Sequence, residues 1–343
     1  MSILQHSLII SASLLMANNV VAQEQDNSVE RIVVTGSAKS AVIMSPKNTL
    51  VDGPFGNNKV VTDIARSLTS ISSDMLEQLS IDDLQDVLTL VPNTYAASGF
   101  GNPSLPTIRG QLGEVFQQGL RRQGGNNGFG IPLSFNSIGQ IDVVKGAPSV
   151  LLGTSQRNGG FVNLNNKVAT LTGTDIKFQA SAGSWEHYRT QLDLNTEIEK
   201  GKSGIRISAE YIDNDSYYDF SGYHSEDLYV AYRLLPDDKS SWDISFEYYD
   251  VDFTDNAGIN RPTQNLIDHG LYITGQGLQP NGSLVPGAFA VVSPTSEIPI
   301  SRSTVLTDPD NINNAQTYLV HSTYQRQLSE VHNLTNRSYF QYL

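Results

Sequence analysis

The stretch IDVVKGAPSVLLGTSQRNGGFVNLNNK, residues 141–167, places a glycine-rich linker between two β-like runs. The runs are Ile141–Val144 and Phe161–Leu164. The stretch contains four glycines: Gly146, Gly153, Gly159 and Gly160. Glycine lowers the stability of regular structure, so such spacing indicates positive φ angles or close backbone approach. The stretch therefore predicts sharp turns between packed strands.

The composition bounds the class of protein. The chain has 343 residues, is 39% apolar, and carries a formal net charge of -13. This length fits roughly two domains. The acidic balance argues against a nucleic-acid partner, which requires a basic face, and against a polybasic membrane-surface binder. Because there are no cysteines, disulfides and thiolate metal sites are excluded. We predict no metal site and no cofactor.

The first 22 residues have the pattern of a secretory signal peptide. Leu8–Met16 is a short apolar run, and Val20 and Ala22 form a small-residue cleavage pattern. The alternative is a buried N-terminal helix, since no Lys or Arg precedes the apolar run. No other apolar run approaches the ~18 residues of a transmembrane helix, so entry into a membrane would require a closed β-barrel.

The sequence pattern of residues 46–170 predicts a compact α+β segment. A polar tail over residues 23–45 precedes it. Ser73 is expected to cap a short helix through Leu79. Ser80 with Asp83 fits a capping box for a helix over Ile81–Leu90. Four apolar residues of this second helix fall on one face at helical spacing: Leu84, Val87, Leu88 and Val91.

From about residue 171 the pattern becomes strictly alternating. In SGIRISAEY the apolar residues Ile205, Ile207, Ala209 and Tyr211 alternate with the polar residues Arg206, Ser208 and Glu210. Short connections alternate with longer ones, the longest covering roughly residues 253–313. Short turns at one end and long loops at the other are typical of a transmembrane barrel, and a loop of about sixty residues would be unusual in a soluble sandwich. About seven strands are present, too few to close a barrel, so we expect the front part of a larger protein.

These features together resemble the TonB-dependent outer-membrane receptors, in which a plug domain sits inside a 22-stranded barrel. The family's plug has an Ile-Arg-Gly element, then a Lys-Gly-Pro-x-Ser type element, then Gly-Gly-x-Ile-Asn and a lysine. Here the matching segments are Ile108–Gly110, Lys145–Gly153, Gly159–Asn163 and Lys167. Two departures occur, because the proline is displaced by one position and Leu152 replaces the usual tyrosine. The resemblance implies an α+β plug domain over residues 46–170 and the first part of an antiparallel transmembrane β-barrel over residues 171–343.

The resemblance also implies roles for particular residues. ERIVVTGSA resembles the TonB box, which would contact TonB through Arg31, Ile32, Val33, Val34, Thr35, Gly36 and Ser37. The loop after residue 119 departs from the family but carries a cationic pair. Six residues would contact an anionic ligand at the plug apex: Arg121, Arg122, Gln123, Asn126, Phe129 and Arg109. Seven would be structural in the plug: Gly110, Lys145, Gly146, Gly153, Gly159, Gly160 and Asn163. Lys145 would lie between plug and barrel, paired with barrel carboxylates.

The function implied is TonB-dependent uptake of a scarce ligand across the Gram-negative outer membrane. A ferric siderophore is the expected ligand, since the layout after residue 171 resembles ferrichrome-type receptors, and TonB with its inner-membrane energising complex is the expected partner. A non-iron ligand such as a sugar or cobalamin stays open, as does a passive porin or adhesin. An enzyme is not expected, because the sequence has neither His-Glu-x-x-His nor Gly-x-Ser-x-Gly.

Overall fold

The computed structural model describes residues 50–51, 59–97, 105–122, 131–147, 157–254, 263–278, 291–305, 307 and 309–342. Two compact units divide the chain, residues 1–41 and 42–343, and all described residues belong to the second. The predicted signal peptide and TonB-box-like segment lie outside the described residues, as do Gln123, Asn126, Phe129 and Gly153. Within the described part, no helix is long and apolar enough to cross a membrane.

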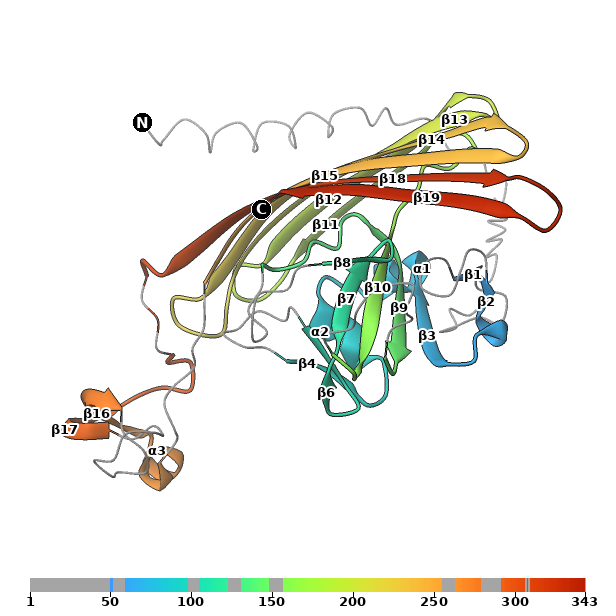
Figure 1. Cartoon of the computed structure of the whole chain (residues 1–343). Helices are drawn as coiled ribbons and strands as arrows, with labels where there is room; N and C mark the ends of the chain where they lie inside the picture. Colours follow the sequence, from blue (N-terminus) through green and yellow to red (C-terminus); the bar gives the residue numbers. More distant parts are fainter. Residues whose placement is uncertain are drawn as a thin grey trace, which may run out of the picture. The chain divides into compact units, whose positions relative to one another are not determined.

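A mixed five-stranded sheet forms the centre of the first domain, in the order β3-β9-β10-β7-β8 (Figure 1). Its strands are β3 (Ser67–Ser72), β9 (Ile138–Lys145), β10 (Gly160–Asn166), β7 (Glu114–Gln117) and β8 (Leu120–Arg121). The two runs predicted in the opening stretch are β9 and β10, which pair antiparallel, while β10 and β7 run parallel. The smaller strands are β1 (Leu50–Val51), β2 (Lys59–Val60), β4 (Thr94–Ala97), β5 (Leu105–Ile108) and β6 (Gln111–Leu112).

Two short helices and a 3-10 turn, η1 (Val61–Asp63), complete this domain. Helix α1 (Ser73–Gln78) follows Ser72 as its N-cap position, and α2 (Leu84–Thr89) follows Asp83. The predicted start of the second helix at Ile81 is therefore wrong. The side chain of Asp83 accepts from the backbone N–H of Asp86 at 2.8 Å and caps the helix itself, whereas Ser80 lies in a turn with φ +50°.

The core of the domain lies between α2 and the sheet. Leu84, Val87 and Leu88 are almost fully buried, which confirms the predicted apolar face of α2. They pack with residues of β3 and β9 in one cluster that includes Ile71, Ile141 and Val143. A second cluster, formed by Phe116, Val144 and Phe161, packs apart from the first, and the rings of Phe116 and Phe161 meet edge to face at 5.5 Å. The sheet is thus apolar where it meets the helices and again around Phe116.

Seven antiparallel strands form a second sheet, which we call the wall, in the order β11-β12-β13-β14-β15-β18-β19 (Figure 1). They are β11 (Asp175–Ala182), β12 (Tyr188–Glu199), β13 (Ser203–Asp215), β14 (Gly222–Asp237), β15 (Ser240–Thr254), β18 (Ile312–Gln327) and β19 (Asn333–Tyr342). The strand count and the short turns near residues 200, 238 and 330 agree with the sequence pattern. The connection between β15 and β18 is not all loop, because it contains α3 (Gln264–His269), β16 (Leu271–Leu278) and β17 (Val291–Pro299).

The wall has its polar face buried and its apolar face exposed. Ser208, Glu210 and Asp227 are less than 9% exposed, although each is polar. On the opposite face Phe178 is 69%, Leu192 46% and Leu228 40% exposed. A soluble sheet buries its apolar face, so this arrangement is inverted. The predicted alternation is confirmed, and the face of the wall that meets the first domain is the polar one.

Candidate functional site at the interface of plug and wall

Four carboxylates line the buried face of the wall: Asp193, Glu210, Asp227 and Glu247. Glu210 and Asp227 are direct cross-strand partners on β13 and β14. Two like charges at such a position repel each other, and burial adds a desolvation cost. The fold must therefore supply donors for each carboxylate. Many of these donors come from the first domain, which we call the plug from here on.

Lys167, just after the last plug strand, is anchored to the wall. Its Nζ donates to Oδ2 of Asp193 at 2.7 Å and to Oγ of Ser208 at 3.3 Å. Arg206 donates to the same carboxylate through Nε at 2.8 Å and Nη2 at 2.9 Å. The backbone carbonyl of Lys167 accepts from the Tyr229 hydroxyl at 2.6 Å. Burial lowers the pKa of Lys167, and the Asp193 carboxylate raises that pKa against the effect of burial.

Asn136 of the plug is fully buried and binds three wall strands at once. Its Nδ2 donates to Oδ1 of Asp227 at 2.6 Å and to the carbonyl of Ser208 at 3.0 Å. Its Oδ1 accepts from Oγ of Ser208 at 2.6 Å and from Nε2 of Gln191 at 2.9 Å. All the hydrogen-bonding capacity of the amide is used, and the β12, β13 and β14 strands are tied to one plug residue.

Glu247 on β15 is bound by a second group of plug residues. Its Oε1 accepts from Oγ of Ser137 at 3.0 Å, and its Oε2 accepts from Nε2 of Gln117 at 3.2 Å. The guanidinium of Arg122 lies in the field of the same carboxylate. Burial lowers the pKa of Arg122, and the Glu247 carboxylate is the largest influence that opposes this effect. Nη1 of Arg122 is buried and has no hydrogen-bond partner among the described residues.

Two ion pairs connect the helical region of the plug to the first strands of the wall: one involves Glu77 of α1 and the other Asp82, which lies between α1 and α2. Arg189 on β12 bridges Asp82 at 2.9 Å and Glu210 at 2.6 Å. Lys177 on β11 pairs with Glu77 of α1 at 2.9 Å and is more exposed. Burial raises the pKa of Asp82, while Arg189 lowers it. The interface thus extends from the helices, through Asn136, to the end of β10.

Replacing Asn136 with leucine should cost about 1–3 kcal/mol, because Asp227 and Ser208 would lose buried partners while a side chain of similar size is kept. The unfolding free energy in denaturant measures this loss. The matched control is Asn165→Leu, which removes an amide that binds Asp142 and Asn163 inside the plug. Faster proteolytic release of the plug is expected for Asn136→Leu. Equal release from both variants would contradict the assigned role.

The predicted structural glycines occupy strained or crowded positions. Gly110 and Gly146 have φ of +76° and +114°. A Cβ on Gly159 would lie 2.8 Å from the Ile108 carbonyl oxygen, and one on Gly160 would lie 2.9 Å from Cδ1 of Ile108. The prediction of turns and close approach in the opening stretch is confirmed for Gly146, Gly159 and Gly160. Asn163 is fully buried, and its Oδ1 accepts from the Gly119 N–H at 3.0 Å, which fixes the turn before β8.

Two of the cationic residues predicted for ligand contact and plug pairing, Arg121 and Lys145, have side-chain partners within the plug. Arg121 pairs with Glu114 at 3.4 Å and lies over the Phe116 ring at 5.7 Å. Arg109 lies in an exposed turn with φ +54°, and its N–H donates to the Asn93 carbonyl. Lys145 Nζ donates to the Pro92 carbonyl at 2.7 Å. The ligand role of Arg121, Arg122 and Arg109 and the barrel partners of Lys145 stay predictions.

Most of the residues that tie plug to wall were not identified as such from the sequence. Alternation placed Ser208, Glu210 and Glu247 on polar faces, and Asp193 and Asp227 could have been assigned to one by the same rule. No such signal exists for Asn136 and Ser137, which lie in an irregular segment before β9. Their role follows only from the pairing of residues far apart in the chain.

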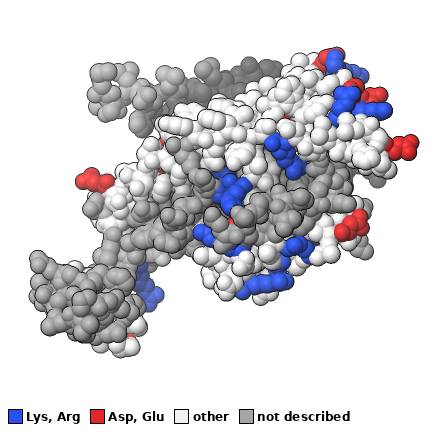
Figure 2. Space-filling model, viewed as in Figure 1, with Lys and Arg blue, Asp and Glu red and all other residues white. Residues whose placement is uncertain are grey.

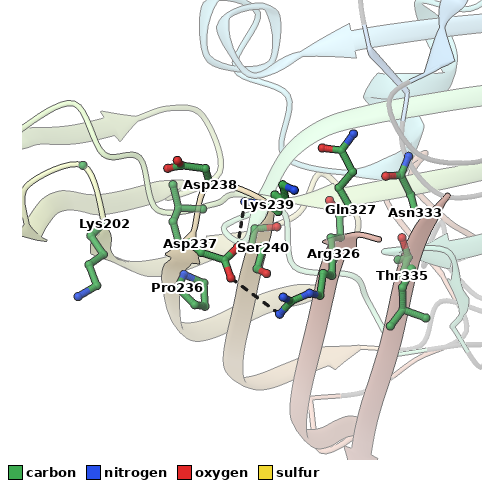
Figure 3. Close-up of a pocket in the computed structure, with 15 residues that line it drawn as sticks. Lys202, Pro236, Asp237, Asp238, Lys239, Ser240, Arg326, Gln327, Asn333 and Thr335 are labelled. Carbon is green, nitrogen blue, oxygen red and sulfur yellow. Dashed lines mark hydrogen bonds and ion pairs between the residues drawn. The ribbon is translucent and has the colours of Figure 1, made fainter. Parts of the chain in front are cut away.

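A separate hollow of about 600 Å³ lies at the short-turn end of the wall (Figure 3). Asp237 points toward Arg326 across it, at 3.8 Å, and both side chains are 47% exposed. Basic and acidic side chains gather at this end of the wall (Figure 2). Exposed ion pairs of this kind contribute little to stability. The Asp237–Arg326 pair therefore holds the hollow only weakly. Among the described residues, no group of His, Asp or Glu is arranged to hold a metal ion.

Residues 60–160 match the family model described as the TonB-dependent Receptor Plug Domain. The probable TonB-dependent siderophore receptor PiuA of Acinetobacter baumannii is 28% identical over 198 residues, which are 53% of this chain and 26% of that protein. The metal-pseudopaline receptor CntO of Pseudomonas aeruginosa is 23% identical over 247 residues, 69% of this chain and 33% of its own. This chain therefore spans about a quarter to a third of the length of these curated relatives.

Solved structures give the same fold. The crystal structure of PiuA from Acinetobacter baumannii superposes with a TM-score of 0.64 at 20% identity, covering 82% of this chain and 37% of that one. BauA, the ferric preacinetobactin receptor of the same organism, gives 0.64 at 16% identity, covering 84% and 39%. The plug match, the plug elements around β9 and β10, and the shared fold agree. Residues 60–160 thus match a TonB-dependent receptor plug domain, and the chain as a whole is similar in fold to siderophore receptors of that kind.

Proposed function

We propose that this chain acts in the TonB-dependent uptake of a ferric siderophore across the outer membrane. The observation that carries the proposal is the plug bound through Asn136, Ser137 and Lys167 to the polar face of an inverted sheet. A sheet with an exposed apolar face suits a lipid environment, and its buried polar face suits a lumen filled by the plug. The names of the relatives, PiuA, CntO and BauA, support an iron- or metal-chelate ligand.

The outer face of the wall supports membrane placement. A cross-strand row of outward residues runs from Phe178 through Leu192 and Leu228 to Tyr248, Tyr318 and Tyr342. The last three rings lie next to one another, with centroids 5.2 and 6.1 Å apart. Tyrosines gather at the interface between lipid and water, where the ring is apolar and the hydroxyl is hydrated. We assign this row to one edge of the lipid-facing band.

The plug argues against a passive porin, because its polar contacts with the wall fill the face that would line a channel. Active transport requires a step that loosens these contacts. In this proposal TonB pairs with the predicted strand at Arg31–Ser37 and applies force there. The relatives named above are described as receptors, which supports transport over catalysis. The ferrichrome-type assignment stays a prediction, since none of the relatives named above carries that description.

Val33→Pro is expected to reduce uptake to the level of a strain without TonB while leaving ligand binding intact. Proline removes a backbone donor and would break the strand pairing that transmits force. Accumulation of a radiolabelled ferric chelate in cells, with and without an uncoupler, measures the effect. Ser28→Pro, outside the predicted segment, is the matched control. Normal uptake by Val33→Pro would contradict the predicted contact with TonB.

The ligand class is tested separately. Cells lacking the gene should fail to grow on one ferric chelate as the iron source and should recover when the gene is restored. Ferrichrome, a catecholate and a carboxylate chelate are supplied in parallel, with a sugar and cobalamin as non-iron alternatives. Growth on every chelate, combined with a defect on the sugar or cobalamin, would overturn the siderophore assignment.

A further inference from the structure

An exposed aromatic group lies at the long-loop end of the wall, on the hairpins β11–β12 and β13–β14. We call it the tip patch, formed by Trp185, Tyr217, Tyr218 and Phe220, which are 57%, 47%, 43% and 61% exposed. The rings of Trp185 and Tyr217 stand at 85° with centroids 6.2 Å apart. Those of Tyr217 and Tyr218 stand at 75° and 5.3 Å. The N–H of Asp215 donates to the Trp185 carbonyl at 2.9 Å and holds the two hairpins together.

The backbone under the tip patch is strained. Trp185 and Glu186 have φ of +55° and +54°, and Phe220 has φ of +57°. Two successive residues with positive φ make the type of hairpin turn that Asn-Gly forms most easily. A tryptophan and a glutamate at these positions strain the backbone, so the turn does not explain their presence. A strained backbone that carries exposed side chains is a reason to ask what Trp185 and Glu186 contact outside the chain.

The tip patch lies beyond the tyrosine row that we assign to the lipid edge. On β13 this row passes through Ala209, and the strand runs on to Asp215, about 20 Å further at the usual rise per residue. Between the level of Ala209 and the tip patch, the outward positions carry Glu226 and Asp250 in one cross-strand row. The following row, closer to the tip, carries Asp213 and Asp252. Carboxylates at these levels exclude hydrocarbon, so the patch faces water. This placement rests on the proposed membrane function.

The surroundings of the tip patch are acidic. Glu186, Asp215 and Asp219 lie in the same two hairpins, and no Lys or Arg occurs between residues 207 and 232. Asp219 is fixed by the segment after β17, since its carboxylate accepts from Oγ1 of Thr304 at 3.3 Å and its N–H donates to the Ser303 carbonyl. Arg302 is the one basic residue within 301–305. Several carboxylates around exposed rings complement several positive charges.

We propose that the tip patch docks a basic polypeptide segment through its arginine or lysine side chains. Two ring pairs near right angles, with Glu186, Asp215 and Asp219 close to them in sequence, can contact a cation with their faces. A sugar would be favoured by a flat ring platform, which the angles of 85° and 75° do not provide. The number of carboxylates favours a chain with several cations over a ligand with a single one.

The chain offers a direct readout, because it has only two tryptophans. In the full chain carrying Trp242→Phe, in lipid nanodiscs, all tryptophan emission comes from Trp185. Titration with a short arginine peptide should change this emission saturably. The same peptide with citrulline in place of arginine, which keeps the shape and removes the charge, should not. Raising the salt concentration should weaken the response, since exposed charges are screened.

Two further variants test the parts of the patch. In the same background, Tyr217→Ala and Glu186→Gln should each weaken peptide affinity by about three- to tenfold, the size of one exposed cation–π contact or ion pair. Asp238→Asn, an exposed acid at the short-turn end, and Tyr339→Ala, an exposed aromatic elsewhere, are the controls and should change nothing. An equal response to the citrulline peptide would overturn the proposal. So would a response to an oligosaccharide without one to the arginine peptide. Weaker peptide affinity in Asp238→Asn or Tyr339→Ala, without any in Tyr217→Ala or Glu186→Gln, would also overturn it.

Discussion

Replacing Asp193 with alanine should destabilise the folded chain by about 3–5 kcal/mol, the cost of leaving buried cations without their carboxylate. Asp193 accepts from Lys167 at 2.7 Å and from two nitrogens of Arg206, and all three side chains are less than a fifth exposed. The variant would keep two positive charges between plug and wall without the carboxylate that binds both of them. The free energy of unfolding in denaturant, measured on the full chain in detergent, gives the loss.

An exposed pair provides the control. Glu199 and Lys202 lie 3.0 Å apart at the short-turn end, 60% and 47% exposed, and Glu199→Ala should change stability little. The double variant Asp193→Leu with Lys167→Met should recover part of the loss, because it removes a cation along with the acid. If Asp193→Ala remained within the range of Glu199→Ala, the anchoring role of Lys167 would be wrong.

Gly160→Ala should cost about 4 kcal/mol or more, or prevent the plug from folding. Gly160 has φ +151°, and an added Cβ would meet Cδ1 of Ile108 at 2.9 Å and the Val144 carbonyl oxygen more closely still. The second contact is with backbone of the paired strand β9, which cannot move without breaking the register. Cleavage of the plug by a protease, compared with the wild-type chain, measures the effect.

Gly183→Ala is the matched control for this position. Gly183 lies in the β11–β12 hairpin, and a Cβ there would meet the nearest atoms, those of His187, at 3.6 Å. This is an ordinary van der Waals contact, so its stability should stay close to that of the wild type. If both variants were equally resistant to protease, crowding at Gly160 would not be the reason for its glycine.

Much of the fold could be predicted, because it depends on local patterns. Period-two alternation identified the wall strands, and the glycines of residues 141–167 indicated the turns around β9 and β10. The start of α2 was wrong since two cap candidates lay three residues apart. Only the structure shows that Asp83 uses its side chain on the Asp86 N–H. Alternation also defines two faces without saying which one meets the plug.

The candidate site was harder to predict, because it depends on pairs far apart in sequence. Arg122 is one of two adjacent cations in a polar loop, and that pattern suggested ligand contact. The carboxylate that raises the pKa of Arg122 most, that of Glu247, belongs to a strand of the other domain, and nothing local in the sequence connects the two. Asn136 shows the same limit, since its partners Gln191, Ser208 and Asp227 come from three wall strands.

The central claim is that the plug lies against the buried polar face of the wall, and one cross-link tests it. The chain has no cysteines, so Asn136→Cys with Ser208→Cys introduces a single pair, at positions whose side chains now meet at 2.6 Å. Mild oxidation of the full chain should join them in one chain, as it should for the control pair Ser70→Cys with Asp142→Cys on neighbouring plug strands. Cross-linking of the control pair without any between residues 136 and 208 would contradict the account.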